Sequence, residues 1–460
     1  MELSQYLADQ IVDRVGNGYE NLTRAAKGAR YCQRPVQLSH HEPMPGEIGH
    51  FFDDRAPSRD DFDIVHFKAC GTRRASLCAP CSRIYQGDAR SLIRVGLLGG
   101  KGIPEDVRSH PAVFATLTPP SFGKVHQAKS RDGIVMQCHP RNSGFCEHGR
   151  RMECWKRHNS DEEIVGSPLC DQCYDYEGAV IWNAASSKLW QRTTIYLRRA
   201  LAKLVGLSIK DLAACVRLSY VKVVEFQRRG LVHLHLAIRL DDPDDISQVP
   251  SIRIDPAQIE LALRVASRQV KVHVGPTDAR HTAAWGDQID TRIIDPNDSG
   301  RVANYIAKYA TKSACNSGAL DRRFRSAEAI EESRAPEHLL AMARTAFKLG
   351  KNPDYKELNL ARWAHDLGHR GHFLTKSRRF SVTFAYLHGL REAWRDRERL
   401  EHGETLDARF DGNNELYFIG QGWPFACDTY LVAQQRKEWD EARTYAKDQI
   451  EEELHQGGQR

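Results

Sequence analysis

The chain has 460 residues, of which 41% are hydrophobic and 27% charged, and its formal net charge is +6. This is the composition of a soluble globular protein with enough chain for a large core. The mild basic bias permits a nucleic-acid partner without requiring one. No apolar run approaches the length of a bilayer span, and the first residues lack the pattern of a signal peptide, which excludes membrane and secreted classes and predicts a cytoplasmic protein.

Cysteines are concentrated early in the chain, where nine of the twelve precede Tyr174. Without a secretion signal, metal ligation explains such a cluster better than disulfides. Cys78 and Cys81 form a CxxC pair that presents two sulfurs to one ion. Cys70 and the earlier Cys32 complete the tetrahedral set that zinc prefers, so we expect a structural Zn2+ site here.

A second group of candidate ligands lies between residues 138 and 173. We expect a zinc site formed by Cys146, Cys154, Cys170 and Cys173. The same stretch offers substitutes, or ligands for a further site, in Cys138, His148 and His158. Closed sites rich in cysteine leave no open position for a substrate, so this Zn2+ is also expected to be structural.

Hydrophobic spacing and turn residues predict mixed helices and strands along the chain. Early in the chain we expect an amphipathic helix within 1–31, a helix at 82–98, a strand at 113–118 and a long helix at 177–205. Further on we expect a helix at 256–267, strands at 270–274 and 287–294, and helices within 301–313, 318–365, 383–402 and 428–456. The basic stretch 368–384, ending in an alternating strand, predicts either a contact with a DNA backbone or a surface strand.

The stretch VKVVEFQRRGLVHLHLAIRL predicts two strands folded back on each other about Arg229. This register places Glu225 opposite His233 and Val223 opposite His235. Because side chains alternate across a strand, the carboxylate and both imidazoles then share one face. Such a set can converge on a divalent metal ion. The alternative is a pair of strand histidines satisfied by hydrogen bonds.

The stretch RVANYIAKYATKS predicts a helix, because its alanines favour that conformation. Tyr305, Lys308, Tyr309 and Lys312 fall at i, i+3, i+4 and i+7, on one face. Two phenols among two ammonium groups suit a phosphate better than an apolar core. A phenol has a pKa near 10, so the lysines or a metal ion would be needed to favour a nucleophilic phenolate. The alternative is a solvated amphipathic helix with two half-buried tyrosines.

Three common nucleotide-binding or metal-binding motifs are missing from the sequence. There is no G-x-x-x-x-G-K-[ST] phosphate loop, so no built-in helicase or ATPase is expected. No G-x-G-x-x-G follows a strand, and no H-E-x-x-H occurs.

Three motifs in this order resemble the HUH endonuclease superfamily: the strand FATLT, the pair His233-Leu-His235 and the tyrosine–lysine helix. More closely, the chain resembles replication initiators of actinobacterial plasmids and integrative conjugative elements. The stretches that carry this resemblance include CGTRRASLCAPC, HPAVFATLTPPSFG, LCDQCYDYEGAVIWN, EFQRRGLVHLH and GHRGHFLTKSRRFSVT. They extend over most of the chain.

The resemblance implies an α+β fold in which a central antiparallel sheet of HUH type carries the histidine pair and is flanked by helices. Cysteine-rich zinc-binding segments precede that sheet. We expect an N-terminal zinc-binding region at 1–110, an endonuclease core at 111–315 with a zinc-binding insertion at 138–173, and a helical, DNA-binding region at 316–460.

The resemblance also implies rolling-circle replication initiation, in which one origin strand is nicked and its 5′ end is held as a phosphotyrosine. His233 and His235 match the metal-binding pair, and Glu225 a third ligand, for Mg2+ or Mn2+. Tyr309 matches the nucleophile, and Tyr305 the second tyrosine of members that have two. The implied partners are single-stranded or supercoiled origin DNA, with a helicase and a polymerase from the host.

Other functions share part of this pattern. A relaxase or a transposase would use the same chemistry, although a relaxase usually has a third histidine close to the pair, and none lies there. A non-enzymatic, zinc-dependent DNA-binding regulator would fold with zinc but would not nick DNA.

Overall fold

The computed structural model describes residues 4–40, 65–276, 281–309, 320, 323–401 and 416–457. The chain forms two compact units, one of Met1–Tyr85 with Arg391–Arg460 and one of Gln86–Leu390. These units differ from the predicted division at 110 and 315, because both ends of the chain fold into the same unit. No helix in the described ranges is long and apolar enough to cross a membrane.

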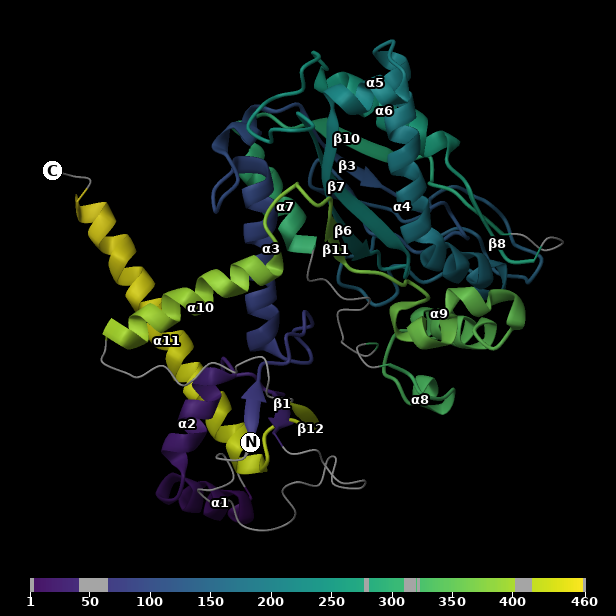
Figure 1. Ribbon diagram of the computed structural model, residues 1–460. Helices are drawn as coiled ribbons and strands as arrows, with labels where there is room; N and C mark the ends of the chain where they lie inside the picture. The colour runs from purple at the N-terminus through teal and green to yellow at the C-terminus, as the bar shows by residue number, and fades with distance from the viewer. Residues whose placement is uncertain are drawn as a thin grey trace. The chain divides into compact units, whose positions relative to one another are not determined.

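A five-stranded antiparallel sheet is the centre of the larger unit (Figure 1), as the resemblance to replication initiators implies. Its strands, in spatial order, are β10 (Ile289–Ile293), β3 (Ala112–Leu117), β7 (Val232–Asp241), β6 (Arg217–Phe226) and β11 (Leu374–Lys376). The long pair β6 and β7 lies inside the sheet, and most of its residues are buried. The strand expected at the end of the basic stretch lies earlier, at β11, and Phe384 instead begins a helix.

Two helices, α4 (Tyr176–Leu204) and α6 (Pro256–Gln269), pack on one face of this sheet. Figure 1 shows α4 on one side of the strands and α7 (Ser299–Tyr309) on the other. Leu189 and Leu197 of α4 join Leu234 and Leu236 of β7 in the core, all fully or almost fully buried. Each such side chain contributes about 1.5–3 kcal/mol on burial. The even positions of β7 therefore fix which face meets α4.

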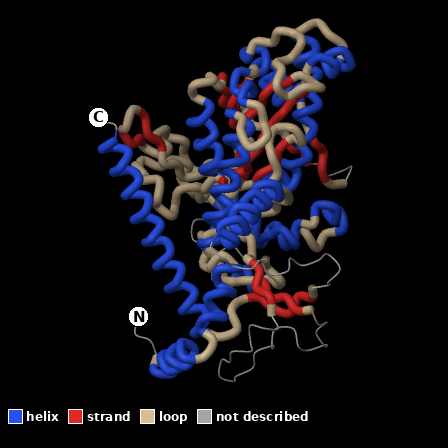
Figure 2. The backbone as a smooth tube through the Cα atoms, turned by 60° about the vertical axis from the view of Figure 1, so that its left-hand side comes forward, coloured by secondary structure: helices blue, strands red, loops and turns tan. Residues whose placement is uncertain are grey.

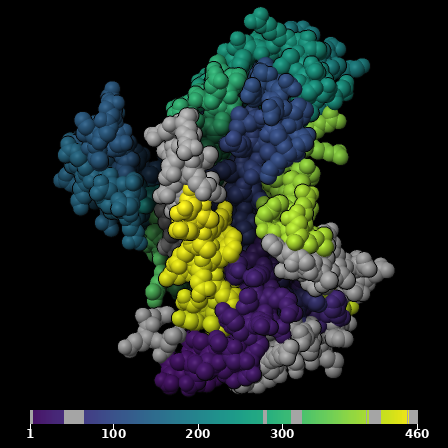
Figure 3. All heavy atoms as spheres, turned by 90° about the vertical axis from the view of Figure 1, so that its left-hand side faces the viewer, coloured from purple at the N-terminus to yellow at the C-terminus, as the bar shows by residue number. Residues whose placement is uncertain are grey.

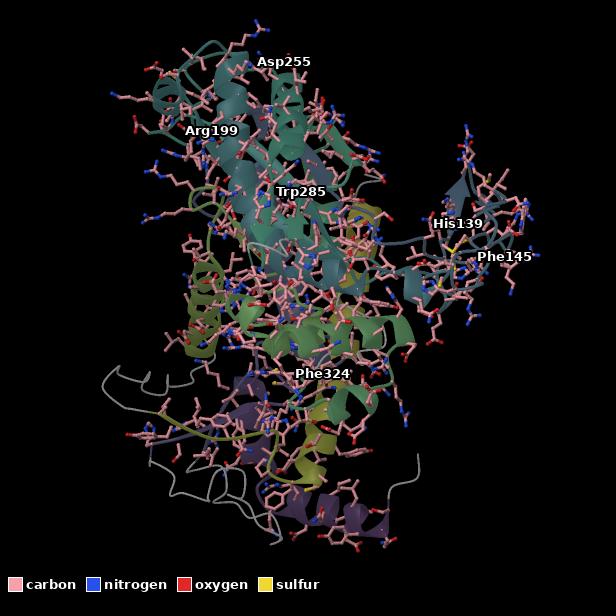
Figure 4. All side chains as sticks on the ribbon, turned by 90° about the vertical axis from the view of Figure 1, so that its right-hand side faces the viewer. His139, Phe145, Arg199, Asp255, Trp285 and Phe324 are labelled. Carbon is pink, nitrogen blue, oxygen red and sulfur yellow. The ribbon has the colours of Figure 1, made fainter. Side chains whose placement is uncertain are left out.

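Both helices begin at aspartate N-caps, as their sequences dictate. Asp175 accepts a hydrogen bond from the main-chain N–H of Gly178. Asp255, marked in Figure 4, forms a capping box with Gln258, and Pro256 occupies the first turn. The same figure shows Trp285 in the core, where its indole N–H donates to Thr193 of α4 at 2.9 Å. These bonds satisfy polar groups that burial would otherwise make costly.

The smaller unit contains helices α1 (Gln5–Gly16), α2 (Tyr19–Gly28) and α11 (Ala426–Gly457) and a three-stranded sheet. That sheet consists of β12 (Tyr417–Gln421), β1 (Val36–Ser39) and β2 (His66–Lys68). The sequence predicts one amphipathic helix in 1–31, but Gly18 adopts φ +89° and separates two helices. Arg14 and Asp428, both fully buried, join α1 to α11 through a 2.7 Å ion pair.

Further elements complete the described fold. The helices are α3 (Ala79–Leu98), α5 (Ile209–Cys215), α8 (Glu328–Glu331), α9 (Glu337–Leu349) and α10 (Phe384–Glu401), and the 3-10 turns are η2 (Glu105–Ser109), η3 (Asp171–Cys173), η4 (Pro353–Leu358) and η5 (Leu360–Asp366). Two small hairpins pair β4 (Lys129–Arg131) with β5 (Ile134–Met136) and β8 (Val272–Val274) with β9 (His281–Ala283).

Residues 124–173, here called the cysteine-rich lobe, contain the first of these hairpins and little other regular structure. Figure 2 shows the lobe as loops around one short pair of strands, and Figure 3 shows it protruding from the larger unit. A segment with so little regular structure buries few apolar side chains, so other interactions must hold its loops together.

A buried charge cluster lies on the sheet face opposite α4. Asp241 accepts hydrogen bonds from Arg239 Nε at 2.6 Å and Ser219 Oγ at 2.5 Å, and its carboxylate is 2.9 Å from His110 Nδ1. Burial by itself would raise the pKa of Asp241, but the bonds from His110 and Arg239 hold that pKa below its usual value. Arg239 also donates to the main-chain carbonyl of Gly96 in α3. The cluster therefore joins strand to helix through paired charges.

We expect Arg239→Met to lower the free energy of unfolding by about 3–5 kcal/mol, because it leaves the buried Asp241 carboxylate without its cation. Urea unfolding followed by tryptophan fluorescence measures the change. The matched control is Arg131→Met, since Arg131 is exposed and its nearest carboxylate, Asp132, is 3.9 Å away. Equal unfolding midpoints for the two variants would contradict the role given to the cluster.

Candidate functional site

The hairpin of β6 and β7 has the predicted register. Glu225 pairs with His233 and Val223 pairs with His235, which confirms a turn centred on Arg229. Gly230 adopts φ +74°, and a Cβ atom there would lie 2.5 Å from Met342 Sδ. The backbone conformation therefore favours glycine at this position, and the side chain of Met342 would have to shift to admit any other residue.

Glu225, His233 and His235 come together on the sheet face opposite α4. One possible ligand atom from each lies within 4.8 Å of the others. His235 Nε2 is 2.7 Å from the Glu225 carboxylate. His233 Nε2 is buried and has no hydrogen-bond partner among the residues that the structure describes. A buried, unpartnered imidazole nitrogen beside a histidine–carboxylate pair fits a divalent cation.

The burial of His233 makes its imidazole suitable as a metal ligand. Burial first, and the neighbouring His235 second, lower the pKa of His233 to about 3. The imidazole is therefore neutral at pH 7, as a metal ligand must be. A cation would take the place of the proton between His235 and Glu225. The donor set of two nitrogens and one carboxylate suits Mn2+ and accepts Mg2+.

Thr116 of β3 orients His235, a role that motif spacing does not reveal. Thr116 pairs with His235 across the β3–β7 ladder, and its hydroxyl lies 3.2 Å from His235 Nδ1. A proton held on Nδ1 leaves the Nε2 lone pair for a metal ion. The FATLT motif is visible in the sequence, but only the sheet order places its first threonine, Thr116, beside the histidine.

Asn183 of α4 holds the hairpin from the opposite face. Its side-chain amide donates to the carbonyl of Gly230 at 2.8 Å and accepts from the main-chain N–H of Val232 at 3.2 Å. Asn183 is fully buried, so both bonds form away from water and fix the start of β7. Spacing within α4 predicts an apolar stripe but gives no sign of this contact.

Helix α7 places both tyrosines at the histidine site, on the shared face that the sequence predicts. The ring of Tyr309 stacks on His235 with centroids 4.2 Å apart and an interplanar angle of 15°. Tyr305 lies edge-on to Phe114 at 5.4 Å and is 5.1 Å from the ring of Tyr309. Tyr305 is 46% exposed, whereas Tyr309 is half-buried. The more enclosed phenol is therefore the one next to the candidate metal ligands.

The surroundings of Tyr309 in the described structure oppose ionisation of its phenol. Burial, a hydrogen bond with Tyr305 and the charge of Glu225 raise the pKa of Tyr309. Lys308 is exposed on α7, and Lys312 lies outside the described residues. In this state the Tyr309 phenol is protonated at neutral pH. A cation bound to Glu225 would offset one of the charges that oppose the phenolate.

A hollow of about 660 Å³ opens beside His233. Its walls come from the end of β3, the turn of the hairpin and the cysteine-rich lobe, and include Thr118, His126, Gly166, Arg228, Arg229 and Asp287. The hollow gives a ligand access to the face that carries the two histidines.

The first predicted zinc group is brought together as expected. Cys32, Cys70, Cys78 and Cys81 offer sulfur atoms within 4.8 Å of one another. The sulfurs of Cys32 and Cys78 are 3.7 Å apart, close to the edge of about 3.8 Å that Zn–S bonds give in a tetrahedron. The main-chain N–H of Cys70 donates to the Cys32 sulfur at 3.3 Å. This geometry fits zinc.

The second predicted group has a different fourth member. Cys146, Cys170 and Cys173 lie with His148, whose Nδ1 is 3.3 Å from the Cys173 sulfur. Cys154 is not in this group. It pairs through its main chain with His139, and its sulfur lies 3.4 Å from His158 Nε2 in a separate group. Spacing could not choose between neighbouring ligands, because the path of the loops decides which of them meet.

Taken together, the fold and the site define an α+β protein whose antiparallel sheet presents a His-His-Glu group to two tyrosines. Residues 18–437 match the family described as "Replication initiator protein, pSAM2" (RepSA). A replication initiator protein of Streptomyces ambofaciens is 37% identical over 457 residues, which cover 95% of this chain and 94% of that relative. The chain belongs to this family of replication initiator proteins, which confirms the resemblance to replication initiators. No solved structure matches the chain.

We expect Thr116→Val to weaken Mn2+ binding about tenfold, because His235 loses the partner that sets its tautomer and ring orientation. Calorimetric titration of the purified chain with Mn2+ measures the affinity. Thr118→Val is the matched control, because Thr118 directly follows β3 but donates to the Gln288 carbonyl instead of contacting His235. Equal Mn2+ affinities in the two variants would show that Thr116 does not position the ligand.

Proposed function

We propose that this replication initiator nicks one strand of origin DNA by metal-assisted attack of Tyr309, the reaction of HUH endonucleases. The observation that supports the proposal most is the stacking of Tyr309 on His235 at 4.2 Å, beside Glu225 and His233. A nucleophile and a possible metal site are thus adjacent on elements far apart in the sequence. Attack of this kind requires both groups at one phosphate.

The proposed reaction is a transesterification. Tyr309 Oη forms a bond to the phosphorus of the scissile phosphodiester, and the bond from phosphorus to the 3′ oxygen breaks. The phenol loses its proton, the departing 3′ oxygen gains one, and the 5′ end stays attached as a phosphotyrosine. The 3′-hydroxyl primes rolling-circle synthesis. One phosphodiester replaces another, so no ATP is consumed, in keeping with the missing phosphate loop.

Glu225, His233 and His235 are the residues that would hold the catalytic Mg2+ or Mn2+. Such an ion supplies positive charge that polarises the phosphate and favours the phenolate. Thr116 orients His235, on whose ring Tyr309 stacks. Lys308, exposed on the same helix, is available for a DNA phosphate. We assign the cysteine-rich groups to structural Zn2+, which N and S ligands prefer.

Tyr305 is suited to a second cleavage. It lies one helical turn before Tyr309, with the ring centroids 5.1 Å apart. While Tyr309 holds the 5′ end, a second phenol at the same site can attack a newly made strand and end a replication round. Host helicase and polymerase would unwind and copy the DNA between these two steps.

The central experiment is a nicking assay on supercoiled DNA of the genetic element that encodes this chain. With Mn2+ we expect open circles whose 5′ end is linked to protein, and with EDTA we expect none, because the phosphate is no longer polarised. Denaturing gels detect the adduct. Binding of this DNA without nicking in Mn2+ would instead identify a zinc-dependent DNA-binding regulator.

Matched tyrosine variants test which phenol attacks. We expect Tyr309→Phe to abolish the covalent adduct, because the nucleophilic oxygen is removed while the ring can still stack on His235. Tyr305→Phe should form the first adduct at a near-normal level and fail in the second cleavage. The same denaturing gel measures both. Full adduct formation by Tyr309→Phe would overturn the assignment of the nucleophile.

A further inference from the structure

We propose that His126, Cys138, Cys154 and His158 form a third structural zinc site, which holds the cysteine-rich lobe on the turn of the catalytic hairpin. The site is separate from the two cysteine-rich groups described above. It does not depend on the nicking reaction, since it is argued from ligand geometry and from contacts of the lobe.

The four side chains converge as a zinc site requires. Their ligand atoms all lie within 4.8 Å of one another, and Cys138 and His158 are buried while His126 and Cys154 are half-buried. Cys154 Sγ is 3.4 Å from His158 Nε2, and Cys138 Sγ is 3.9 Å from His126 Nδ1. Tetrahedral Zn–S and Zn–N bonds give an edge of about 3.6 Å between sulfur and nitrogen. Two thiols and two imidazoles are a common structural zinc set.

Groups around the four side chains match the surroundings of a bound metal ion. Glu162 Oε2 lies 2.7 Å from His158 Nδ1, the ring nitrogen that does not face the cysteines. Glu162 is fixed in turn by the main-chain N–H of Asn159, which donates to Oε1 at 2.7 Å. The main-chain N–H of Gln127 donates to the Cys138 sulfur at 3.2 Å. A carboxylate behind a ligating histidine and an N–H bond to a thiolate both stabilise such sites.

Hydrophobic packing does not explain why these groups lie together. Figure 4 shows sulfur atoms beside His139 in the lobe, among loops with few strands or helices. The large apolar side chains of Phe145 and Trp155 are 65% and 53% exposed there. A lobe that leaves its aromatic residues in solvent has little core, so metal ligation is the stronger source of order.

Residues of the lobe next to the ligands contact the turn between β6 and β7. Arg228 of the turn donates through Nη1 to the main-chain carbonyl of Glu162 at 2.6 Å. Gly166 lies so close that a Cβ atom there would be 2.5 Å from the carbonyl carbon of Arg228. Main-chain hydrogen bonds join the ligand His126 to Gly166 at 2.9 Å and to Ser167 at 2.8 Å. These bonds hold His126 beside the contact with the turn. The segment that follows the last ligand, His158, therefore rests on the turn.

This contact shapes the hollow beside His233, because His126, Gly166 and Arg228 all line it. Loss of the third zinc ion would release one wall of the hollow while leaving the sheet intact.

The decisive measurement is the zinc content of the purified full-length chain after dialysis against metal-free buffer. We expect the double variant Cys138→Ser, Cys154→Ser to contain one zinc ion per chain fewer than wild type. Cys215→Ser is the matched control and should lose none, because Cys215 lies outside every cysteine group found in the described residues. An unchanged zinc content in the double variant would overturn the proposal.

A milder pair of variants keeps the test independent of misfolding. Glu162→Gln should weaken zinc retention against a chromophoric chelator about tenfold for one ion per chain, whereas its exposed neighbour Glu163→Gln should not. In the same samples, hydrogen exchange should rise at the turn, where Gly230 N–H bonds to the Gln227 carbonyl. Equal chelator curves for the two variants would refute the role of Glu162, and turn protection unaffected by zinc loss would refute the link to the hairpin.

Discussion

The antiparallel pairing of β6 with β7 is the constraint on which the site depends. Its register puts Glu225 beside His233 and His235, and a slip of one residue would turn the histidines into the core under α4. Apolar residues at the even positions of β7 oppose such a slip, because they would lose their burial. Asn183 and Gly230 add a further restraint at the turn. The alternation of side chains along β7 between the two faces of the sheet therefore sets both the core packing and the geometry of the site.

The opposite face of the sheet carries two groups of polar residues, one near each end of β7. Near one end of β7, Arg239 and Asp241 form a buried charge cluster that joins the sheet to α3. Near the other end, the histidines meet Glu225 and the aromatic ring of Tyr309. Paired charges stabilise the first region, whereas the second retains an imidazole nitrogen without a partner in the described structure. That contrast separates a structural cluster from a candidate reactive site.

The proposed zinc sites of the cysteine-rich lobe lie where hydrophobic packing is weak. The larger unit has an extensive core between α4 and the sheet, but the cysteine-rich lobe consists mainly of loops. Sulfur and imidazole ligands can close such loops with little buried apolar area. Contacts of the lobe with Arg228, at Gly166 and at the Glu162 carbonyl, then join the ordered loops to the hairpin. In this arrangement the lobe supports the site without providing any of the three residues that surround the candidate cation.

The sequence by itself determined the strands of the hairpin, their register, the long helix α4 and the shared face of Tyr305 and Tyr309. These features follow from local periodicity and turn chemistry, which depend only on residues that are close together in the sequence. Only the tertiary structure decided that Thr116 supports His235, that His148 rather than Cys154 joins the second cysteine group, and that both chain ends fold into one unit. Each of these depends on strand order or loop path between distant segments, and spacing along a chain contains no information about either.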